Sequence, residues 1–184
     1  EAFTICHIGS MNKDRNPRIL WEALAQLKKD YPVFAQRLKI KLIGQVDFAI
    51  QEAIRKNGLE QQLERLDFMP HAEVVEHMKN AQLLLLPVNS TPNAMGILPG
   101  KLYEYLGAHR PVLAIGPLTS DAAKVISMTK AGSISDYADL EGLKRNIIGY
   151  FEQYLEGKLE VDSAEIDQFS RKALAGKYAA LLSS

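Results

Sequence analysis

The feature that most constrains the fold of this chain is the alternation of short β-forming runs with segments of helical periodicity. The β-forming runs are FTICHI (3–8), KIKLIG (39–44), RLDFM (65–69), QLLLLPV (82–88), PVLAI (111–115) and GSIS (132–135). This alternation is typical of βαβ units, in which helices cover both faces of a parallel sheet. Leu83 to Leu86 show no polar alternation, as expected of a central strand that is buried on both faces. The sequence therefore predicts a three-layer α/β sandwich with a parallel sheet of about six strands.

The segments between these runs carry helix signals. Asn16 is a candidate cap for a helix with Pro17 in its first turn, and the apolar residues of that helix form one stripe. A second helix is expected from Asp47, as its cap, to Asn57, with Gly58 just past its end. Further helices are expected at 73–80, from Pro99 onward, and at 120–131, 139–156 and 164–182.

Length and composition are those of one globular domain. The chain has 184 residues, of which 47% are hydrophobic and 24% are charged, so we expect 1–184 to form a single domain. Its 22 basic and 22 acidic residues cancel, which argues against a nucleic-acid partner. The chain starts at Glu1 and enters an apolar run at Phe3, so we expect a fragment that was cut at a domain boundary.

The expected location rests on cysteine usage and on the lack of membrane signals in the sequence. The single cysteine, Cys6, can form no internal disulfide, which points to a reducing compartment, and we expect it to be a buried strand residue. No apolar stretch approaches the ~20 residues of a membrane span, and no cleavable signal is visible. We therefore expect a cytoplasmic location.

The loop after the first strand, HIGSMNKDRNP (7–17), is the first candidate binding site. Gly9 allows a tight turn at the strand end, and the helix that follows offers free N–H groups and a positive dipole end to a phosphate. Lys13, Arg15 and Arg18 add positive charge. The spacing matches neither the dinucleotide fingerprint nor the P-loop, so nothing here predicts a redox cofactor or phosphate hydrolysis. On its chemistry alone, the loop is equally well a solvated basic turn.

The second candidate site follows the fourth strand, where a polar loop (88–100) leads into a helix at Pro99. Loops at the carboxyl ends of parallel strands carry the ligand sites of such sheets. Gly100 lets a ligand approach the backbone, while Lys101 and Glu104 share one helix face. A cation beside a carboxylate suits a ligand with a phosphate and a hydroxyl-bearing ring. The alternative is an ordinary surface ion pair worth ~0.2–0.5 kcal/mol.

Two motifs, in the same order along the chain, give a family resemblance. In the second segment, a Pro-x-Lys-x-x-Glu-Tyr pattern precedes a turn and a Pro-Val strand, at Pro99, Lys101, Glu104, Tyr105, Arg110, Pro111 and Val112. The opening loop has a glycine, five residues, a basic position and its neighbour, and a later alanine, at Gly9, Arg15, Asn16 and Ala23. Both motifs resemble those of the retaining GT-B glycosyltransferases of the group 1 type. The resemblance implies a Rossmann-like GT-B carboxy-terminal domain.

Carried over position by position, the resemblance also assigns ligand roles. Glu104 would bind the ribose hydroxyls and Arg15 the diphosphate, assisted by Lys101 and by the backbone amides around 98–100. The base would lie near the end of the third strand. The implied donor-binding set is Gly9, Ser10, Lys13, Arg15, Leu98, Pro99, Gly100, Lys101 and Glu104, and the implied base-binding set is Met69, Pro70 and His71.

Two positions depart from the pattern of that family. Gly96 stands where the family commonly has a glutamate that contacts the donor sugar, so the resemblance does not identify that sugar. Ser10 stands where the family often has an arginine, which would weaken the grip on the diphosphate unless Lys13 substitutes.

The resemblance further implies a function. The chain would bind the donor of an enzyme that transfers a sugar from a nucleoside-diphosphate sugar to a polysaccharide, glycolipid or similar acceptor, with retention. An amino-terminal domain absent from this sequence would bind the acceptor, and without it the isolated domain would be inactive. The implied partners are the sugar nucleotide and that domain in cis, with no nucleic acid, and with membrane association only through the missing domain or the acceptor. No cofactor and no metal is required by this scheme.

Two other functions stay open. One is a non-catalytic nucleotide- or protein-binding module such as a flavodoxin-like receiver, which needs acidic residues after the first strand and a phosphorylatable aspartate at the third. Here the first strand ends at His7 and Ile8, and Asp67 is expected inside a strand. The other is half of a GT-B nucleotide-sugar epimerase. The four histidines lie in different elements, so no shared metal site is predicted, and His71 and His109 are expected at the surface or in turns.

Overall fold

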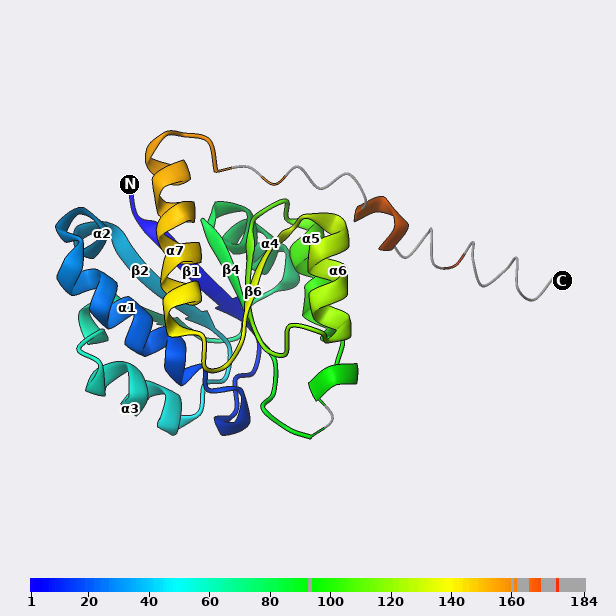
Figure 1. The fold of residues 1–184 in the computed structure, drawn as a ribbon, viewed down its shortest axis with the longest axis horizontal. Coiled ribbons are helices and arrows are strands. Elements are labelled where there is room, and N and C mark those ends of the chain that lie inside the picture. The colour runs from blue at the N-terminus through cyan, green and yellow to red at the C-terminus, as the bar shows by residue number, and fades with distance from the viewer. Residues whose placement is uncertain (93, 160, 162–165, 170–174, 176–184) are drawn as a thin grey trace, which may run out of the picture.

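The centre of the molecule is one sheet of six parallel strands, in the order β3-β2-β1-β4-β5-β6. The computed structural model describes residues 1–92, 94–159, 161, 166–169 and 175. The strands are β1 (Phe3–Ile8), β2 (Leu38–Ile43), β3 (Leu63–Leu66), β4 (Leu83–Pro87), β5 (Val112–Ile115) and β6 (Gly132–Ser135). β1 runs from the amino terminus toward the lower edge of Figure 1, so the carboxyl ends of all six parallel strands lie on that side. The predicted α/β class is confirmed.

Helices cover both faces of this sheet (Figure 1). Among the described residues, the α-helices are α1 (Arg18–Asp30), α2 (Pro32–Arg37), α3 (Phe48–Lys56), α4 (His71–Asn80), α5 (Gly100–Gly107), α6 (Asp121–Thr129) and α7 (Leu140–Leu155). Short 3₁₀ helices are η1 (Lys13–Arg15), η2 (Glu60–Gln62), η3 (Ala94–Gly96) and η4 (Ile166–Phe169). Helices α1, α2, α3 and α7 pack on one face, and α4, α5 and α6 pack on the other. The predicted three-layer arrangement follows.

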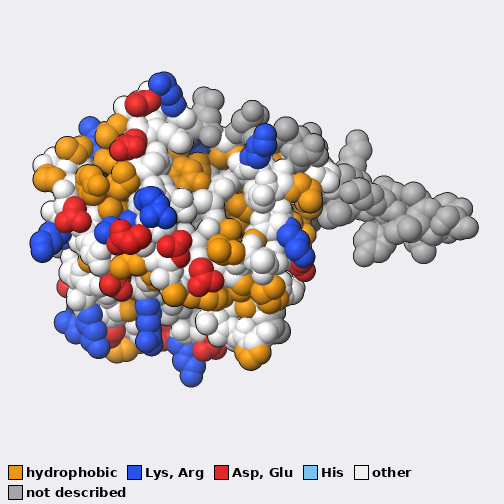
Figure 2. Space-filling model, viewed as in Figure 1, with side chains coloured by type: hydrophobic (Ala, Val, Ile, Leu, Met, Phe, Trp, Pro, Cys, Tyr) orange, Lys and Arg blue, Asp and Glu red, His pale blue; other side chains and the backbone are white. Residues whose placement is uncertain are grey.

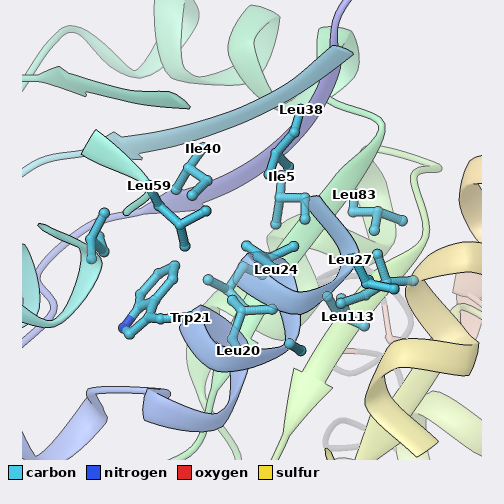
Figure 3. Packing of buried hydrophobic residues seen from close by; sticks show 14 of the residues in the cluster. Ile5, Leu20, Trp21, Leu24, Leu27, Leu38, Ile40, Leu59, Leu83 and Leu113 are labelled. Carbon is cyan, nitrogen blue, oxygen red and sulfur yellow. The ribbon is translucent and has the colours of Figure 1, made fainter. Parts of the chain in front are cut away.

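The first hydrophobic layer lies between the sheet and helices α1, α2, α3 and α7. It contains the apolar stripe that the sequence predicts on α1. Leu20, Leu24 and Leu27 of this helix point at the sheet, where they meet strand residues such as Ile5 and Leu83 (Figure 3). All five side chains are at most 1% exposed. Burying one such side chain stabilises the fold by about 1.5–3 kcal/mol. This stripe therefore fixes α1 against the centre of the sheet.

The run of four leucines in β4 contributes to both layers. Leu83 and Leu85 belong to the layer beneath α1, whereas Leu84 and Leu86 belong to the layer beneath α5 and α6. This alternation follows from the two-residue period of a strand, and it confirms the predicted central strand. Cys6 of β1 is likewise buried, as predicted, and burial raises the pKa of its thiol to about 12.

The cap predicted for α1 is wrong, whereas the cap predicted for α3 is confirmed. Pro17 is the residue that precedes α1, and its carbonyl accepts a hydrogen bond from the Leu20 amide at 2.8 Å. The side chain of Asn16 instead accepts a hydrogen bond from the indole N–H of Trp21 at 2.8 Å. This follows because the indole of a fully buried tryptophan needs an acceptor. The Asp47 carboxylate accepts from the backbone two residues later at 2.8 Å.

Other differences from the predicted boundaries are local. Helix α2, which begins at Pro32, has only six residues and was not predicted, because so short a segment shows no clear periodicity. The last expected helix, at 164–182, lies largely outside the described residues, of which 166–169 form η4.

The third strand ends earlier than predicted, which bears on the receiver alternative. β3 stops at Leu66, so Asp67 lies beyond the strand and is exposed instead of lying within it. The sheet order nevertheless excludes the receiver topology. A flavodoxin-like sheet places the first strand between the second and the third, whereas here β1 lies between β2 and β4.

The surface carries charges of both signs. On the face covered by α1 and α7, lysine and arginine side chains are interspersed with aspartate and glutamate (Figure 2). Within the described part of the chain, no helix combines the length and the apolar composition needed to cross a membrane.

We expect Leu24→Ala to lower the free energy of unfolding by about 2–5 kcal/mol, because it leaves a cavity in the first layer. Leu118→Ala is the matched control. It removes the same atoms from a side chain that is 56% exposed, and it should change the free energy by less than about 0.5 kcal/mol. Denaturant unfolding followed by circular dichroism measures both, and equal losses would contradict this packing.

Candidate functional site

The candidate site lies where the order of strand addition reverses, between β1 and β4. After β1 the chain builds β2 and β3 on one side, and after β4 it builds β5 and β6 on the other side. The loops that leave β1 and β4 therefore start side by side at the same edge of the sheet. In open α/β sheets, ligands bind in the crevice between such loops. Both candidate loops of the sequence lie here, at the lower edge of Figure 1.

A buried tyrosine fastens α5 to both central strands. The phenol oxygen of Tyr105 accepts a hydrogen bond from the Ile8 amide at 3.1 Å and donates one to the Leu85 carbonyl at 3.3 Å. Burial raises the pKa of this phenol, so it stays protonated. Leu102 and Leu106 of the same helix are buried in the hydrophobic layer between the sheet and helices α4, α5 and α6. The amino end of α5 is thereby fixed beside the loop that follows β1.

Lys101, in the first turn of α5, lies directly over Gly9. The Gly9 backbone has a φ of +93°, which supports the tight turn predicted at the end of β1. A Cβ atom at this position would lie 2.7 Å from both Cε and Nζ of Lys101. Glycine at this position thus leaves the space that the end of the Lys101 side chain occupies, and α5 meets the loop after β1 through this pair.

His7, the residue before the end of β1, completes the contact and was not predicted as a site residue. Its ring is 1% exposed, Nδ1 lies 3.0 Å from the Leu85 carbonyl oxygen, and Nε2 lies 3.4 Å from Nζ of Lys101. Burial, and after it the positive charge of Lys101, lowers the pKa of His7 from 6.5 to about 3. The only sequence signal was a polar residue in an apolar strand immediately before the loop.

The positive charge of Arg15 acts on Lys101 at this point. Burial and the nearby charge of Arg15 lower the pKa of Lys101 from 10.5 to about 8, although Glu104 opposes the shift. Within the described part of the chain, neither Arg15 nor Lys101 forms an ion pair with a carboxylate. The surface ion pair that the sequence also allowed between Lys101 and Glu104 is therefore not formed. Two adjacent unneutralised cations favour a bound anion.

The rim of the crevice is held together by hydrogen bonds between its loops. Nε of Arg15 donates to the side-chain oxygen of Asn89 at 2.5 Å, which joins the loop after β1 to the loop after β4. The hydroxyl of Tyr137, after β6, donates to the Asn89 carbonyl at 2.8 Å and lies 3.2 Å from the Val88 carbonyl. These contacts orient the Arg15 guanidinium before any ligand arrives.

A groove of about 270 Å³ opens beside these cations. Its volume lies just below the ~300–1,000 Å³ that is typical of small-molecule sites. One wall is apolar and the other carries a cation and a carboxylate. The lining residues are Ile8, Gly9, Ile43, Phe68, Met69, His71, Val74, Lys101 and Glu104. The groove can therefore hold a flat apolar ring at one end and a polar, anionic group at the other.

A larger hollow of about 490 Å³ lies between α1 and α3 but suits an anion less well. It is lined by Arg18 and Lys56, together with the carboxylates of Glu22 and Glu52. The acidic side chains offset the basic ones there, so the electrostatic argument favours the groove beside Lys101.

The structure brings together part of the predicted site set. Gly9, Met69, His71, Lys101 and Glu104 line the groove. Arg15 acts on Lys101 through its charge, and Leu98, Pro99 and Gly100 lead into α5. Ser10, Lys13 and Pro70 are exposed and lie outside the lining, with Pro70 preceding α4. Gly96 is exposed in η3.

Two histidines and one phenylalanine of interest are exposed at the surface. His71 and His109 are exposed, as predicted. Phe68 was not predicted as a site residue, although it is 72% exposed and lines the groove. Its sequence signal was an aromatic residue within the predicted third strand (65–69), which in the structure ends earlier, at Leu66. Among the described residues, no group of three His, Cys, Asp or Glu side chains is placed to bind a metal ion.

The comparison with protein families identifies the family. The family described as "Glycosyl transferases group 1" matches residues 2–153, which include β1, β4, α5 and the groove. The chain belongs to this family. The resemblance of its two motifs to group 1 glycosyltransferases is thereby confirmed. No curated protein matches this group 1 chain in sequence.

Solved structures share the fold of this group 1 chain. WaaG, a glycosyltransferase involved in lipopolysaccharide biosynthesis, aligns with a TM-score of 0.62 and 20% identity over 84% of this chain and 40% of that chain. A TarM variant from S. aureus, solved with fondaparinux, α-GlcNAc-glycerol and UDP, aligns with a TM-score of 0.72 and 15% identity over 100% of this chain and 36% of that chain. The carboxy-terminal domain of LpcC from Francisella tularensis aligns with a TM-score of 0.63 and 12% identity over 88% of this chain and 81% of that chain. The group 1 chain thus spans less than half of WaaG and of TarM.

We expect the ammonium of Lys101 to titrate near pH 8 instead of near 10.5, because burial and Arg15 disfavour its charge. Its protonated fraction then falls as the pH rises from 7 to 9. Competitive acetylation at a series of pH values, followed by mass spectrometry of the Lys101 peptide, measures this pKa. A value near 10.5 would show that the side chain is free in water and does not lie over Gly9.

Proposed function

We propose that this chain is the donor-binding domain of a retaining glycosyltransferase and that it binds the diphosphate of a sugar nucleotide beside Lys101. The observation that carries the proposal is the pair of adjacent cations, Arg15 and Lys101, without a carboxylate partner in the described part of the chain. A diphosphate placed next to both cations would relieve their mutual repulsion. Membership of the glycosyl transferases group 1 family supports a sugar nucleotide as the source of that diphosphate.

The amino end of α5 adds to this attraction. No side chain caps the helix, and Pro99, which precedes it, has no N–H group of its own. The first-turn amides of Gly100 and Lys101 are therefore available to phosphate oxygens, and the helix dipole favours negative charge there. Backbone amides, Lys101 and Arg15 together form a cradle that is positively polarised before the ligand binds.

The rest of the nucleotide would fill the groove. Glu104 lies one turn along α5 from the first-turn amides and lines the same groove, so its carboxylate can accept hydrogen bonds from ribose hydroxyls. The wall formed by Phe68, Met69 and His71 would receive the base. The TarM structure that contains UDP covers the whole of this chain in the alignment and supports UDP as the first probe.

Catalysis would depend on how strongly this cradle stabilises the negative charge of the leaving nucleoside diphosphate. In sugar transfer from a nucleoside-diphosphate sugar, negative charge develops on the β-phosphate as the glycosidic bond breaks. Preorganised donors in a cleft that excludes water stabilise such charge effectively. Here the donors would be Arg15, Lys101 and the backbone amides of α5. Glu104 would orient the nucleotide and take no part in bond breaking. The scheme requires no metal.

A second domain would be needed to complete the reaction. This chain spans less than half of WaaG and of TarM, which leaves room in a whole enzyme for an amino-terminal domain that binds the acceptor. The isolated chain would then bind the donor and transfer no sugar. The free buried thiol of Cys6 suits the cytoplasm, where sugar nucleotides would reach the groove directly.

Titration of the 184-residue chain with UDP, GDP and dTDP by calorimetry should show weak binding of one of them at pH 7. The same titration at pH 9 should show weaker binding, because Lys101 loses its proton as the pH passes about 8. Absence of heat with all three nucleotides, for a folded sample, would count decisively against the proposed donor site.

Glu104→Ala should weaken the binding of that nucleotide by about 1–3 kcal/mol, because an acceptor of ribose hydroxyls is lost. Glu152→Ala, on the exposed side of α7 and across the sheet from the groove, is the control and should leave the affinity unchanged. An unchanged affinity in Glu104→Ala would remove the assigned role of this carboxylate.

A further inference from the structure

We propose that His7 is a positioning residue that holds the ammonium of Lys101 over Gly9, where it faces the diphosphate site. His7 belongs to neither motif on which the family resemblance rests, and it lies within β1, beneath the groove and outside its lining. The consequence for nucleotide binding rests on the proposed function, whereas the contact itself does not.

The hydrogen-bonding roles of the two ring nitrogens follow from the partners of His7. A backbone carbonyl can only accept, so the Nδ1 atom that lies 3.0 Å from the Leu85 oxygen must carry the proton. The ring is neutral at ordinary pH, because it is buried and faces positive charge. Nε2 is then an acceptor, and it lies 3.4 Å from the Lys101 ammonium, which can only donate.

Lys101 is the partner of the ring at Nε2, while the backbone groups of Leu85 and Ser10 also interact with the ring and raise its pKa. The Leu85 carbonyl already receives a hydrogen bond from the Tyr105 hydroxyl at 3.3 Å, so it does not depend on His7 for a partner. A polar ring that is 1% exposed in a strand of apolar side chains costs stability unless its own polar atoms are paired. Nε2 is paired through Lys101, which ties the lysine to β1.

This tie matters because a lysine side chain is flexible. Its ammonium lies at the end of four rotatable bonds, and an unrestrained lysine would spend much of its time extended into water. The other charged groups near the ammonium are Arg15, which repels it, and Glu104, with which it forms no ion pair in the described part of the chain. His7 is thus the acceptor that keeps the ammonium at Gly9, next to the first turn of α5.

Two substitutions at one position separate the roles of the two nitrogens. In His7→Asn the amide nitrogen takes the place of Nδ1, so the hydrogen bond to Leu85 is kept and the acceptor for Lys101 is lost. In His7→Gln the terminal amide reaches the place of Nε2 and can supply an acceptor again. Circular dichroism and thermal unfolding show whether each variant is folded.

The direct measurement is the pKa of Lys101, by competitive acetylation and mass spectrometry, in the 184-residue chain and both variants. We expect about 8 in the unaltered chain, a rise toward 10.5 in His7→Asn as the released ammonium moves into water, and a return toward 8 in His7→Gln. An unchanged or lower pKa in folded His7→Asn overturns the positioning role. If neither variant folds, the ring-nitrogen shifts of the unaltered chain decide, since a proton on Nε2 instead of Nδ1 also overturns it.

UDP affinity is the second measurement and separates this inference from the proposed function. His7→Asn should bind UDP about tenfold more weakly, the size of effect expected when a charged partner is no longer held in place, and His7→Gln should recover most of the loss. Failure of the unaltered chain to bind UDP, GDP and dTDP would contradict the donor site, while the acetylation result would still test the role of His7.

Discussion

The candidate site depends on the close approach of a lysine to a glycine at the carboxyl edge of the central strands. The end of the Lys101 side chain occupies space that a side chain at position 9 would enter, because a Cβ on Gly9 would lie 2.7 Å from both its Cε and its Nζ atom. The approach brings a positive charge, the amino end of α5 and the loop after β1 to one point. A larger residue at position 9 would displace the end of the Lys101 side chain, and the ammonium would leave this point.

The two hydrophobic layers hold α5 and the loop after β1 in the positions at which Lys101 reaches Gly9. Leu84 and Leu86 hold β4 in the layer beneath α5, while the opposite layer fixes α1 and with it the loop that carries Arg15. Tyr105 then sets the position of α5 against both β1 and β4 by two hydrogen bonds. The cations are therefore presented by rigid elements, which suits a site that must stabilise charge without rearranging.

Local patterns predicted the elements well, because each depends on nearby residues. The four leucines of β4, the Asp47 cap and the shared face of Lys101 and Glu104 are signals within a few positions of one another. The contacts that build the site are not local. Lys101 meets His7 across 94 residues, and Tyr105 meets Ile8 across 97, so the partners emerge only once the strand order is known. Asn16 shows the same limit on a smaller scale, because the buried indole of Trp21 competed for its side chain.

A nucleoside diphosphate is expected to bind between the loop after β1 and the amino end of α5. A map of backbone amide shifts in the ¹⁵N-labelled chain, recorded as UDP is added, locates the bound ligand. The largest changes should fall within 9–15 and 100–104, with smaller ones at 68–71. Changes centred on the hollow between α1 and α3, around Arg18 and Glu52, would place the ligand elsewhere and contradict this expectation.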